Sequence, residues 1–235
     1  MKRILLLALV FSQSVKCYCQ TSIQYFKMGD IKADSGNYSG AISDYNKAIA
    51  INPNFTDAYN DRGYAKAELE DYQGAIADYD KAIALNPADT DAYNNRGNAK
   101  YALEEYNGAI LDYNKTIELD PAYSNAYYNR GHTKYDLRDY KGAVSDYDKA
   151  IALKPEDAEA YNHRGTAKDS LKDYQGAMSD FNKAIVLNPK YSRAYYNRGT
   201  LKILSGQKES GCADLRKAAD LGLEKAIVQI KKNCN

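Results

Sequence analysis

Residues that could carry catalysis or bind a metal are scarce in this chain of 235 residues, which has two histidines and four cysteines. A Ser–His–Asp or Cys–His nucleophilic set would need His132 or His163, and a zinc site needs about four nitrogen, sulfur or oxygen ligands. The sequence supplies no further ligands for either histidine, and its glycines are not clustered as in a phosphate-binding loop. We therefore predict no enzymatic activity, no cofactor and no metal.

The charge balance excludes another class of function. The chain has 32 Lys and Arg residues against 31 Asp and Glu residues, which gives a net charge of +1. A protein that neutralises nucleic-acid phosphates needs a clear excess of basic residues, so we predict no nucleic-acid partner. The composition, 44% hydrophobic and 27% charged, is too polar for a multi-span membrane protein and too apolar for a disordered one. The 23 tyrosines against 4 phenylalanines indicate a repeated template.

The N-terminus has the pattern of a secretory signal peptide. A short basic start precedes the apolar run Ile4–Phe11, which is much shorter than the about 20 residues that a bilayer-spanning helix needs. Cys17 and Cys19 are the small residues at positions −3 and −1 of a cleavage before Gln20. We expect residues 1–19 to be removed, the mature protein to be periplasmic or extracellular, and no membrane insertion after cleavage. A lipoprotein and a buried first helix are the alternatives.

Glycines and prolines recur with one fixed period along the sequence. The same step separates each of the five prolines from the next, and eleven of the fifteen glycines fall into two columns with this step. A fixed period of about 34 residues is the signature of a repeat protein. The prolines are Pro53, Pro87, Pro121, Pro155 and Pro189.

Each period has the pattern of two helices, as residues 56–89 illustrate. Thr56 is a candidate N-cap for a first helix, in which apolar residues recur every three or four positions. A second helix begins at about Asp71 and carries a clear apolar stripe as far as Asn86, where the residue before a proline avoids the helical conformation. No segment alternates in the manner of a β-strand. The sequence therefore predicts a series of helical hairpins.

Two helices in each period resemble the tetratricopeptide repeat (TPR) family, whose signature is W-x2-L-G-x2-Y…A-x3-F…P. Tyrosine occupies the Trp position of this signature. The Gly position holds the glycine column that includes Gly63, which we call the first glycine column, and the other column is the second. The Ala, Phe and Pro positions hold an alanine column, an aromatic column and the five prolines. The resemblance implies an all-α, right-handed α-solenoid over residues 20–235. Its parts are five full repeats (22–55, 56–89, 90–123, 124–157 and 158–191), a degenerate sixth repeat (192–222) and a capping helix (223–233).

Two positions depart from the family pattern, with arginine in place of leucine and lysine in place of tyrosine, and a column of aspartates lies on the second helices. In a hairpin the arginine falls near the aspartate, so we predict structural ion pairs; the alternative is that the arginines recognise an anion. The lysines are expected to lay their aliphatic stems over the core and turn their amines outward. The predicted pairs are Arg62–Asp78, Arg96–Asp112, Arg130–Asp146 and Arg164–Asp180.

The first helices of a solenoid line its concave surface. Asn and Tyr are frequent at the positions that point away from the core, and their hydrogen bonds suit an extended peptide backbone. We therefore predict a non-catalytic scaffold that binds a protein or peptide ligand in this groove. The predicted groove residues are Asn60, Tyr64, Asn94, Asn95, Asn98, Tyr101, Tyr128, Asn129, His132, Tyr135, Asn162 and His163.

Other uses of this groove remain open. A glycan or small ligand could bind the same Tyr and Asn residues, or the face could simply be solvated. The Lys/Arg/Asn clamp with which some TPR proteins bind acidic chaperone tails is not expected, because the groove offers Lys27 and Arg193 at opposite ends with acidic residues between them. The sequence defines neither the partner nor the oligomeric state.

Cys212 and Cys234 remain after removal of residues 1–19, and an even number of cysteines in an exported protein indicates a disulfide. The last repeat of a solenoid has an apolar face that needs a cap. We expect the capping helix to fold back on the second helix of the sixth repeat, so that a bond between the two cysteines closes a loop of about 20 residues. Two free thiols are the alternative.

Overall fold

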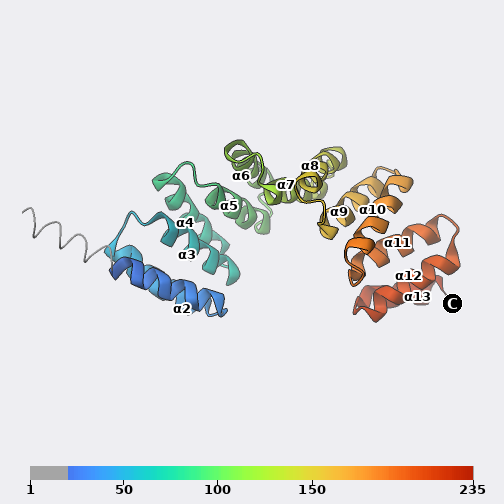
Figure 1. The fold of residues 1–235 in the computed structure, drawn as a ribbon, viewed down its shortest axis with the longest axis horizontal. Coiled ribbons are helices and arrows are strands. Elements are labelled where there is room, and N and C mark those ends of the chain that lie inside the picture. Colours follow the sequence, from blue (N-terminus) through green and yellow to red (C-terminus); the bar gives the residue numbers. More distant parts are fainter. Residues whose placement is uncertain (1–20, 235) are drawn as a thin grey trace, which may run out of the picture. The chain divides into compact units, whose positions relative to one another are not determined.

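The computed structural model describes residues 21–234, and every regular element in this range is an α-helix (Figure 1). The signal peptide expected over residues 1–19 lies outside the described residues. None of the described helices is long and apolar enough to cross a membrane. After a first helix over residues 21–34, the helices are α2 (Tyr38–Ile51), α3 (Thr56–Glu68), α4 (Tyr72–Leu85), α5 (Thr90–Ala102), α6 (Tyr106–Leu119), α7 (Ser124–Asp136), α8 (Tyr140–Leu153), α9 (Ala158–Ser170), α10 (Tyr174–Leu187), α11 (Ser192–Leu204), α12 (Lys208–Asp220) and α13 (Glu224–Asn233).

These helices form two compact units, each described by itself. Unit 1 ends at Pro121 and contains the described helices up to α6, whereas unit 2 begins at Ala122 and contains α7 to α13. Helices pack in pairs as hairpins, α3 with α4 and α5 with α6 in unit 1, and α7 with α8, α9 with α10 and α11 with α12 in unit 2. Each hairpin is one repeat, and its two members are the first and the second helix of that repeat.

Side-chain caps and glycines start most of the second helices. In α4, the Asp71 side chain accepts a hydrogen bond from the amide N–H of Gly74 (3.0 Å), and Asn37, Asp139 and Asp173 cap α2, α8 and α10 in the same way. A Cβ atom at Gly74 would lie 2.1 Å from the Asp71 carboxylate, so this cap requires the second glycine column. In α6 the capping position holds a longer glutamate, which makes no such bond.

The first helix of the second repeat begins differently from the prediction. Thr56 is the first helical residue of α3 and not its N-cap, which is Phe55. The Phe55 carbonyl accepts the first hydrogen bond of the helix, from the amide N–H of Tyr59 (3.3 Å), and no side chain caps this end. The Phe55 ring packs on the ring of Phe26 with centroids 4.8 Å apart. Aromatic packing therefore accompanies this helix start in place of a side-chain cap.

The turn between the two helices of a repeat contains one residue in the left-handed conformation. Glycine adopts this conformation without steric penalty, whereas other L-residues lose roughly 1 kcal/mol. The first and sixth repeats use glycine there, and the four central repeats do not. These residues are Gly36, Glu70, Glu104, Arg138, Lys172 and Gly206, with φ between 60° and 82°.

The core of a hairpin is an aromatic ring packed against a glycine. In the second repeat, a Cβ atom at Gly63 would lie 2.8 Å from the ring of Tyr79, a distance at which atoms overlap. The first glycine column therefore allows the two helices to approach closely, and Ala75 and Ala99 pack beside the same ring. The buried rings of the five full repeats are those of Tyr45, Tyr79, Tyr113, Tyr147 and Phe181.

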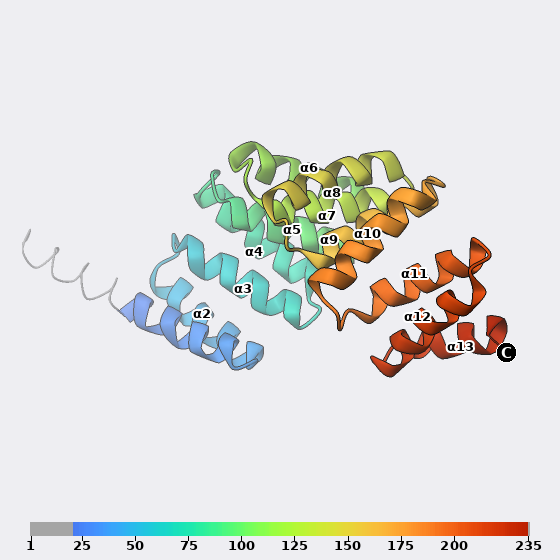
Figure 2. The ribbon, with the colours of Figure 1, turned by 45° about the vertical axis from the view of Figure 1, so that its right-hand side comes forward.

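A helix and a disulfide close the C-terminal end of unit 2. Helix α13 lies beside α12 and packs on it (Figure 2). Ala226 of α13 is fully buried, and a disulfide links Cys212 to Cys234, whose Cα atoms are 5.7 Å apart, within the about 7 Å that such a bond allows. Val228 on the other side of α13 is 67% exposed. The helix thus covers the last repeat and presents its own outer side to solvent.

Candidate functional site

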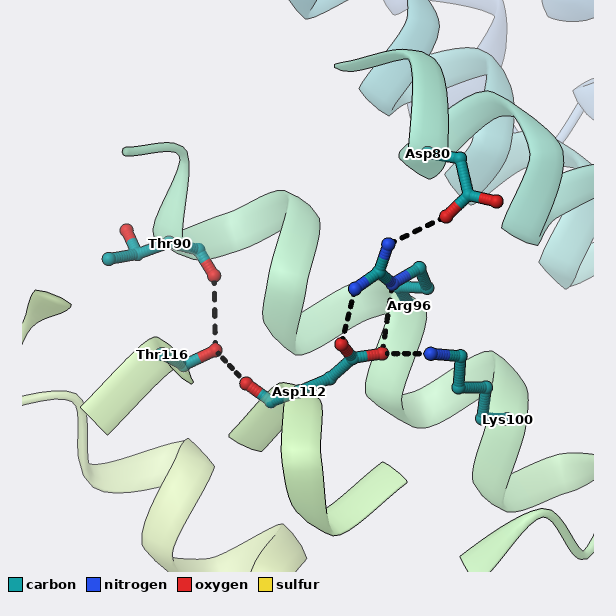
Figure 3. A network of polar contacts seen from close by, with 6 residues as sticks. All are labelled: Asp80, Thr90, Arg96, Lys100, Asp112 and Thr116. Atoms are coloured by element: carbon teal, nitrogen blue, oxygen red, sulfur yellow. Dashed lines mark hydrogen bonds and ion pairs between the residues drawn. The ribbon is translucent and has the colours of Figure 1, made fainter. Parts of the chain in front are cut away.

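The charged columns form a network inside the repeats, which Figure 3 shows for the third repeat. Asp112 is 3% exposed and lies between Arg96 and Lys100. The Arg96 guanidinium donates from Nε to Oδ2 (2.9 Å) and from Nη2 to Oδ1, and the Lys100 ammonium lies 2.8 Å from Oδ2. A buried carboxylate is stable only when it is paired and hydrogen-bonded, and two cations satisfy both conditions here.

The same triad of arginine, aspartate and lysine recurs in four other repeats, including the degenerate sixth. The first repeat has Met28 in place of arginine, and Lys32 and Lys47 pair with Asp44 instead. The further triads are Arg62–Asp78–Lys66, Arg130–Asp146–Lys134, Arg164–Asp180–Lys168 and Arg198–Asp214–Lys202.

The prediction that the lysine amines turn outward is wrong. In the second repeat, the Lys66 ammonium lies 2.8 Å from Oδ2 of Asp78, and the Lys66 side chain is 22% exposed. The reason is the acceptor capacity of a carboxylate, whose two oxygens offer about four hydrogen-bond sites. Arginine uses one site on each oxygen and leaves room for the second cation.

Each of these arginines also contacts the preceding tyrosine, and most of them reach a neighbouring repeat. The carbon of the Arg96 guanidinium lies 5.4 Å from the centre of the Tyr93 ring, and Nη1 donates to Asp80 of the preceding repeat (2.6 Å; Figure 3). All three nitrogens of this guanidinium are engaged within the chain, which favours a structural role over the binding of an external anion. The equivalent contacts to a preceding repeat are Arg62–Asn46, Arg164–Asp148 and Arg198–Asn182.

The first helices of unit 1 carry a cavity of about 220 Å³, the unit 1 cavity. Tyr64 and Glu68 of α3 line it, together with Tyr79 of α4 and Asn95 and Asn98 of α5. Three of these side chains, those of Tyr64, Asn95 and Asn98, belong to the predicted groove. The cavity therefore combines aromatic surface with amide groups that can both donate and accept hydrogen bonds.

The same helices of unit 1 carry partly buried acids. Burial and the charge of Asp30 together raise the pKa of Asp61 to about 6, and a hydrogen bond from Asn60 Nδ2 (3.1 Å) acts against both. Burial also raises the pKa of Asp30, although the Tyr45 hydroxyl donates to its Oδ1 (2.9 Å). This face of unit 1 is therefore acidic and holds protons more tightly than free carboxylates do.

The first helices of unit 2 carry a second cavity, of about 240 Å³, to which α13 also contributes. The His132 and His163 rings meet edge to face, with centroids 5.1 Å apart. Asn197 Nδ2 donates to Asn162 Oδ1 (2.9 Å). This unit 2 cavity is lined by His132, Tyr135, Asn162, His163, Thr166, Arg193, Asn197 and Lys225.

The unit 2 cavity is electropositive. Burial and, to a smaller extent, the neighbouring His132 and Arg193 together lower the pKa of His163 to about 4. Burial and the charge of Arg193 also lower the pKa of Lys225. Two cations and two imidazoles thus share a cavity whose surroundings disfavour additional positive charge.

The two cavities contain seven of the twelve predicted groove residues. The other five lie nearby in the fold but in different environments. Asn94 is buried and Asn129 is partly exposed. Asn60 accepts a hydrogen bond from Asn95 Nδ2 (3.4 Å). Tyr101 packs on Tyr106, and Tyr128 packs edge-on against His163, with ring centroids 5.5 Å apart in both pairs.

The predicted groove omits several residues that line the unit 2 cavity, among them Arg193, Asn197 and Lys225. Asn197 follows His163 by one full period, so the repeat pattern contained the signal for it. Lys225 lies on the capping helix, where no period applies. Among the described residues, no group of three or more His, Cys, Asp or Glu side chains could hold a metal ion.

Two family models match the chain. The model described as TPR repeat matches residues 29–69, 63–103 and 97–137, and the model described as tetratricopeptide repeat matches residues 124–157 and 158–191. These matches run from residue 29 to residue 191 and cover more than half of the sequence. No curated protein sequence matches the chain.

Several solved structures share the fold. The crystal structure of MamA protein is 27% identical, with a TM-score of 0.65 over 74% of this chain and 95% of that one. YrrB, described as a TPR protein with an unusual peptide-binding site, is 24% identical, with a TM-score of 0.65 over 80% of this chain and 97% of its own. PilF of Pseudomonas aeruginosa is 16% identical, with a TM-score of 0.80 over 92% and 98% of the two chains. The shared fold is an α-solenoid of helical hairpins.

Proposed function

This chain belongs to the tetratricopeptide repeat family, and from that premise we propose that it is an exported, non-catalytic scaffold that binds an extended segment of a partner protein. The binding face consists of the first helices of each unit. YrrB, a similar TPR protein, is described as having a peptide-binding site, which supports this class of ligand.

One observation carries the proposal: in each unit the cavity on the first helices is lined by amide and hydroxyl side chains of the predicted groove, which can both donate and accept hydrogen bonds. These side chains are Asn95 and Asn98 in unit 1, and Asn162 and Tyr135 in unit 2. An extended peptide presents unpaired N–H and C=O groups, which amide and hydroxyl side chains can satisfy. The arginines and lysines of the triads form ion pairs with buried aspartates inside the repeats, so we place the binding contacts on the amide and hydroxyl side chains.

Site-specific cross-linking tests the proposed face. A photoreactive phenylalanine analogue is placed at Tyr64 in the unit 1 cavity, at Tyr135 in the unit 2 cavity, or at Tyr174 on a second helix. Tyr64 and Tyr174 are a matched pair, 45% and 47% exposed. We expect a discrete partner protein to be captured in the native compartment from the first helices and not from Tyr174.

A competition experiment completes this test. Alanine at Asn95 and Asn162 should weaken binding of the captured partner at least tenfold, because each change removes hydrogen bonds from one cavity. Equal capture from all three positions, or binding that survives both substitutions, would contradict the proposed face. A glycan array probed with the same protein distinguishes the other use of the groove, since strong glycan binding without protein capture would favour that alternative.

Export is tested separately. The basic start, the eight-residue apolar run and the cleavage pattern support it, as does the cysteine pair at the other end of the chain. Protein recovered from the periplasm or the medium should begin at Gln20. An N-terminus at Met1 in the recovered protein would contradict export by this route.

A further inference from the structure

Two cations in the unit 2 cavity have no carboxylate partner. Arg193 and Lys225 both line the cavity, and neither forms an ion pair with any acid of the described chain. They are close enough for Arg193 to lower the pKa of Lys225, and the Lys225 ammonium lies over the Tyr196 ring, 4.3 Å from its centre. Cations that repel each other in a concave site are stabilised by an anion.

The repeats themselves show which anion such a pair of cations accommodates. In each triad an arginine and a lysine bind one carboxylate from two sides, as Arg96 and Lys100 do with Asp112. Arg193 and Lys225 offer the same two cationic groups without the aspartate. The cavity of about 240 Å³ is large enough for a carboxylate and part of the residue that bears it.

A titratable ring lies in the same cavity and completes the argument. The groups that face His163 are His132, Asp136 and Tyr128 from α7, Tyr147 from α8, Asp157 from the start of α9, Arg193 from α11 and, across the cavity, Lys225 from α13. Burial and the two basic neighbours outweigh Asp157 and Asp136, so the pKa of His163 is about 4. His163 is therefore neutral at pH 7 when no anion is bound.

We propose that the unit 2 cavity binds a carboxylate of the partner peptide between Arg193 and Lys225, and that binding draws a proton from solvent onto the His163 ring. This inference rests on the proposed function, because it names the chemistry of one contact on the same face. The bound carboxylate offsets the charge of Arg193 and gives the imidazolium an anionic neighbour, so the electrostatic repulsion that helps to keep His163 neutral is replaced by attraction. One carboxylate bound is linked to the uptake of up to one proton.

Proton uptake makes binding tighter in acid. If the carboxylate restores the pKa of His163 to about 6, affinity at pH 5 is about tenfold higher than at pH 7, because each pKa unit corresponds to a factor of ten. Ordinary peptide carboxylates, with a pKa of about 4, remain ionised over this range. The site is therefore distinct from a clamp of permanently charged residues, whose affinity does not change between these pH values.

Histidine NMR tests the coupling directly, since the chain has two histidines and so two imidazole Cε1–H signals, which a His132→Gln variant assigns. The probes are acetyl-Ala-Ala-Ala with a free C-terminal carboxylate, acetyl-Ala-Glu-Ala amide, acetyl-Ala-Ala-Ala amide and inorganic phosphate. We expect saturable binding of one or both carboxylate peptides, a rise in the titration midpoint of His163 by about one to two pH units, and none of this with the uncharged amide. The two carboxylate peptides distinguish a chain terminus from an acidic side chain.

Three variants separate the parts of the proposal. Arg193→Gln and Lys225→Gln should each weaken probe binding about tenfold at pH 5, whereas the matched control Lys190→Gln, an exposed cation on the turn before α11, should not. His163→Gln should retain the weaker binding seen at pH 7 and lose its pH dependence. Thermal unfolding of each variant at pH 7 identifies any that has lost its fold.

The outcomes distinguish this inference from the proposed function. Absence of probe binding at millimolar concentrations, equal pH dependence in His163→Gln, or binding of phosphate without either carboxylate peptide would overturn the inference, even if partner capture from Tyr64 and Tyr135 persists. Probe binding with the expected pH dependence, without capture of any partner from those positions, would support the site and contradict the proposed function.

Discussion

Unit 1 has acidic residues and unit 2 has histidines at the same positions of one repeat template. Asp30 and Asp61 lie on consecutive first helices of unit 1, and His132 and His163 occupy the same two positions in unit 2, three periods later. The helices are closely similar in length, and the neighbouring aromatic core is the same. The template therefore determines where a side chain lies and how far it is buried, and the residue type determines whether that position is acidic or basic.

Burial acts on Asp61 and His163 in the same physical sense, with opposite results for their pKa values. It raises the pKa of Asp61 to about 6 and lowers the pKa of His163 to about 4, because a low-dielectric environment disfavours the charged form of either group. Acid therefore neutralises the charge on one face and adds charge to the other. The two units should respond to pH in opposite directions, although their folds are alike.

The largest effect is expected where the two units do not differ, in the triads. Asp112→Ala in unit 1 and Asp146→Ala in unit 2 each leave a partly buried arginine and lysine without their carboxylate, so each should lower the free energy of unfolding by about 3–5 kcal/mol. Urea unfolding measures the loss. Glu118→Ala, which breaks an exposed ion pair with Lys115, is the control and should leave the free energy of unfolding almost unchanged.

A double-mutant cycle sharpens this result. Arg96→Met combined with Asp112→Ala should cost clearly less than the sum of the two single changes, because the second substitution removes a charge that the first has already left unpaired. Losses below about 1 kcal/mol for both aspartates, with no coupling in the cycle, would refute a structural role for the triads.

The disulfide between Cys212 and Cys234 is a second difference between the two units, because both cysteines lie in unit 2. Replacing Cys212 and Cys234 by alanine opens a loop with a sequence separation of 22, which should cost about 3 kcal/mol. Hydrogen exchange should show faster opening of α12 and α13 and no change in unit 1. Two reactive thiols in denatured, non-reduced protein that begins at Gln20 would contradict the bond itself.

Acid should destabilise unit 2 through His163. The pKa of His163 is about 4 in the folded chain against about 6.5 when unfolded, so the unfolded state binds more protons between these values. The stability present at pH 7 is lost as pH falls from about 6.5 toward 4, by about 2–3 kcal/mol. His163→Gln does not titrate, and comparing its unfolding with the unmodified protein at pH 7 and pH 4.5 isolates this contribution. An identical pH dependence in both proteins would argue against it.

Asp61 should give the opposite response in unit 1, and a smaller one. Its folded pKa of about 6 lies above the ordinary value of 3.8, so the folded state holds the proton more tightly. Charged Asp61 therefore destabilises unit 1 at pH 7, and this penalty is lost progressively as pH falls from about 6 to the ordinary value of 3.8. Asp61→Asn should raise the free energy of unfolding by about 1–2 kcal/mol at pH 7 and by little at pH 4. Asp57→Asn, an exposed acid on the same helix, should have no such effect.

The period predicted the fold because glycine and proline mark positions that tolerate few other residues. Gly63 allows the Tyr79 ring to approach, Gly74 allows the Asp71 cap, and the predicted capping helix 223–233 differs by one residue from the observed Glu224–Asn233. Thr56 was mistaken for an N-cap because a hydroxyl residue before an acidic one has the local pattern of a cap, and the pattern contains no information about the packing of Phe55.

The candidate site was harder to predict because it depends on where long or flexible side chains turn. The lysine amines turn inward to the aspartates, which the helix position alone does not indicate. Asn94 and Asn95 are neighbours of the same type in the sequence, yet Asn94 is 5% exposed and Asn95 lines the unit 1 cavity. Lys225 enters the unit 2 cavity from α13, whose placement depends on the packing of the last repeat and the disulfide.

The second to fifth repeats each carry both an arginine and an acceptor residue at the positions of the contact that joins neighbouring repeats. Arg96 donates to Asp80 of the preceding repeat, and Arg164 donates in the same way to Asp148. A gene segment that encodes one period and is duplicated in frame therefore brings an arginine for the repeat before it and an acceptor for the repeat after it. Recombination can lengthen or shorten such a gene without a compensating mutation, while substitutions on the first helices change what the protein recognises.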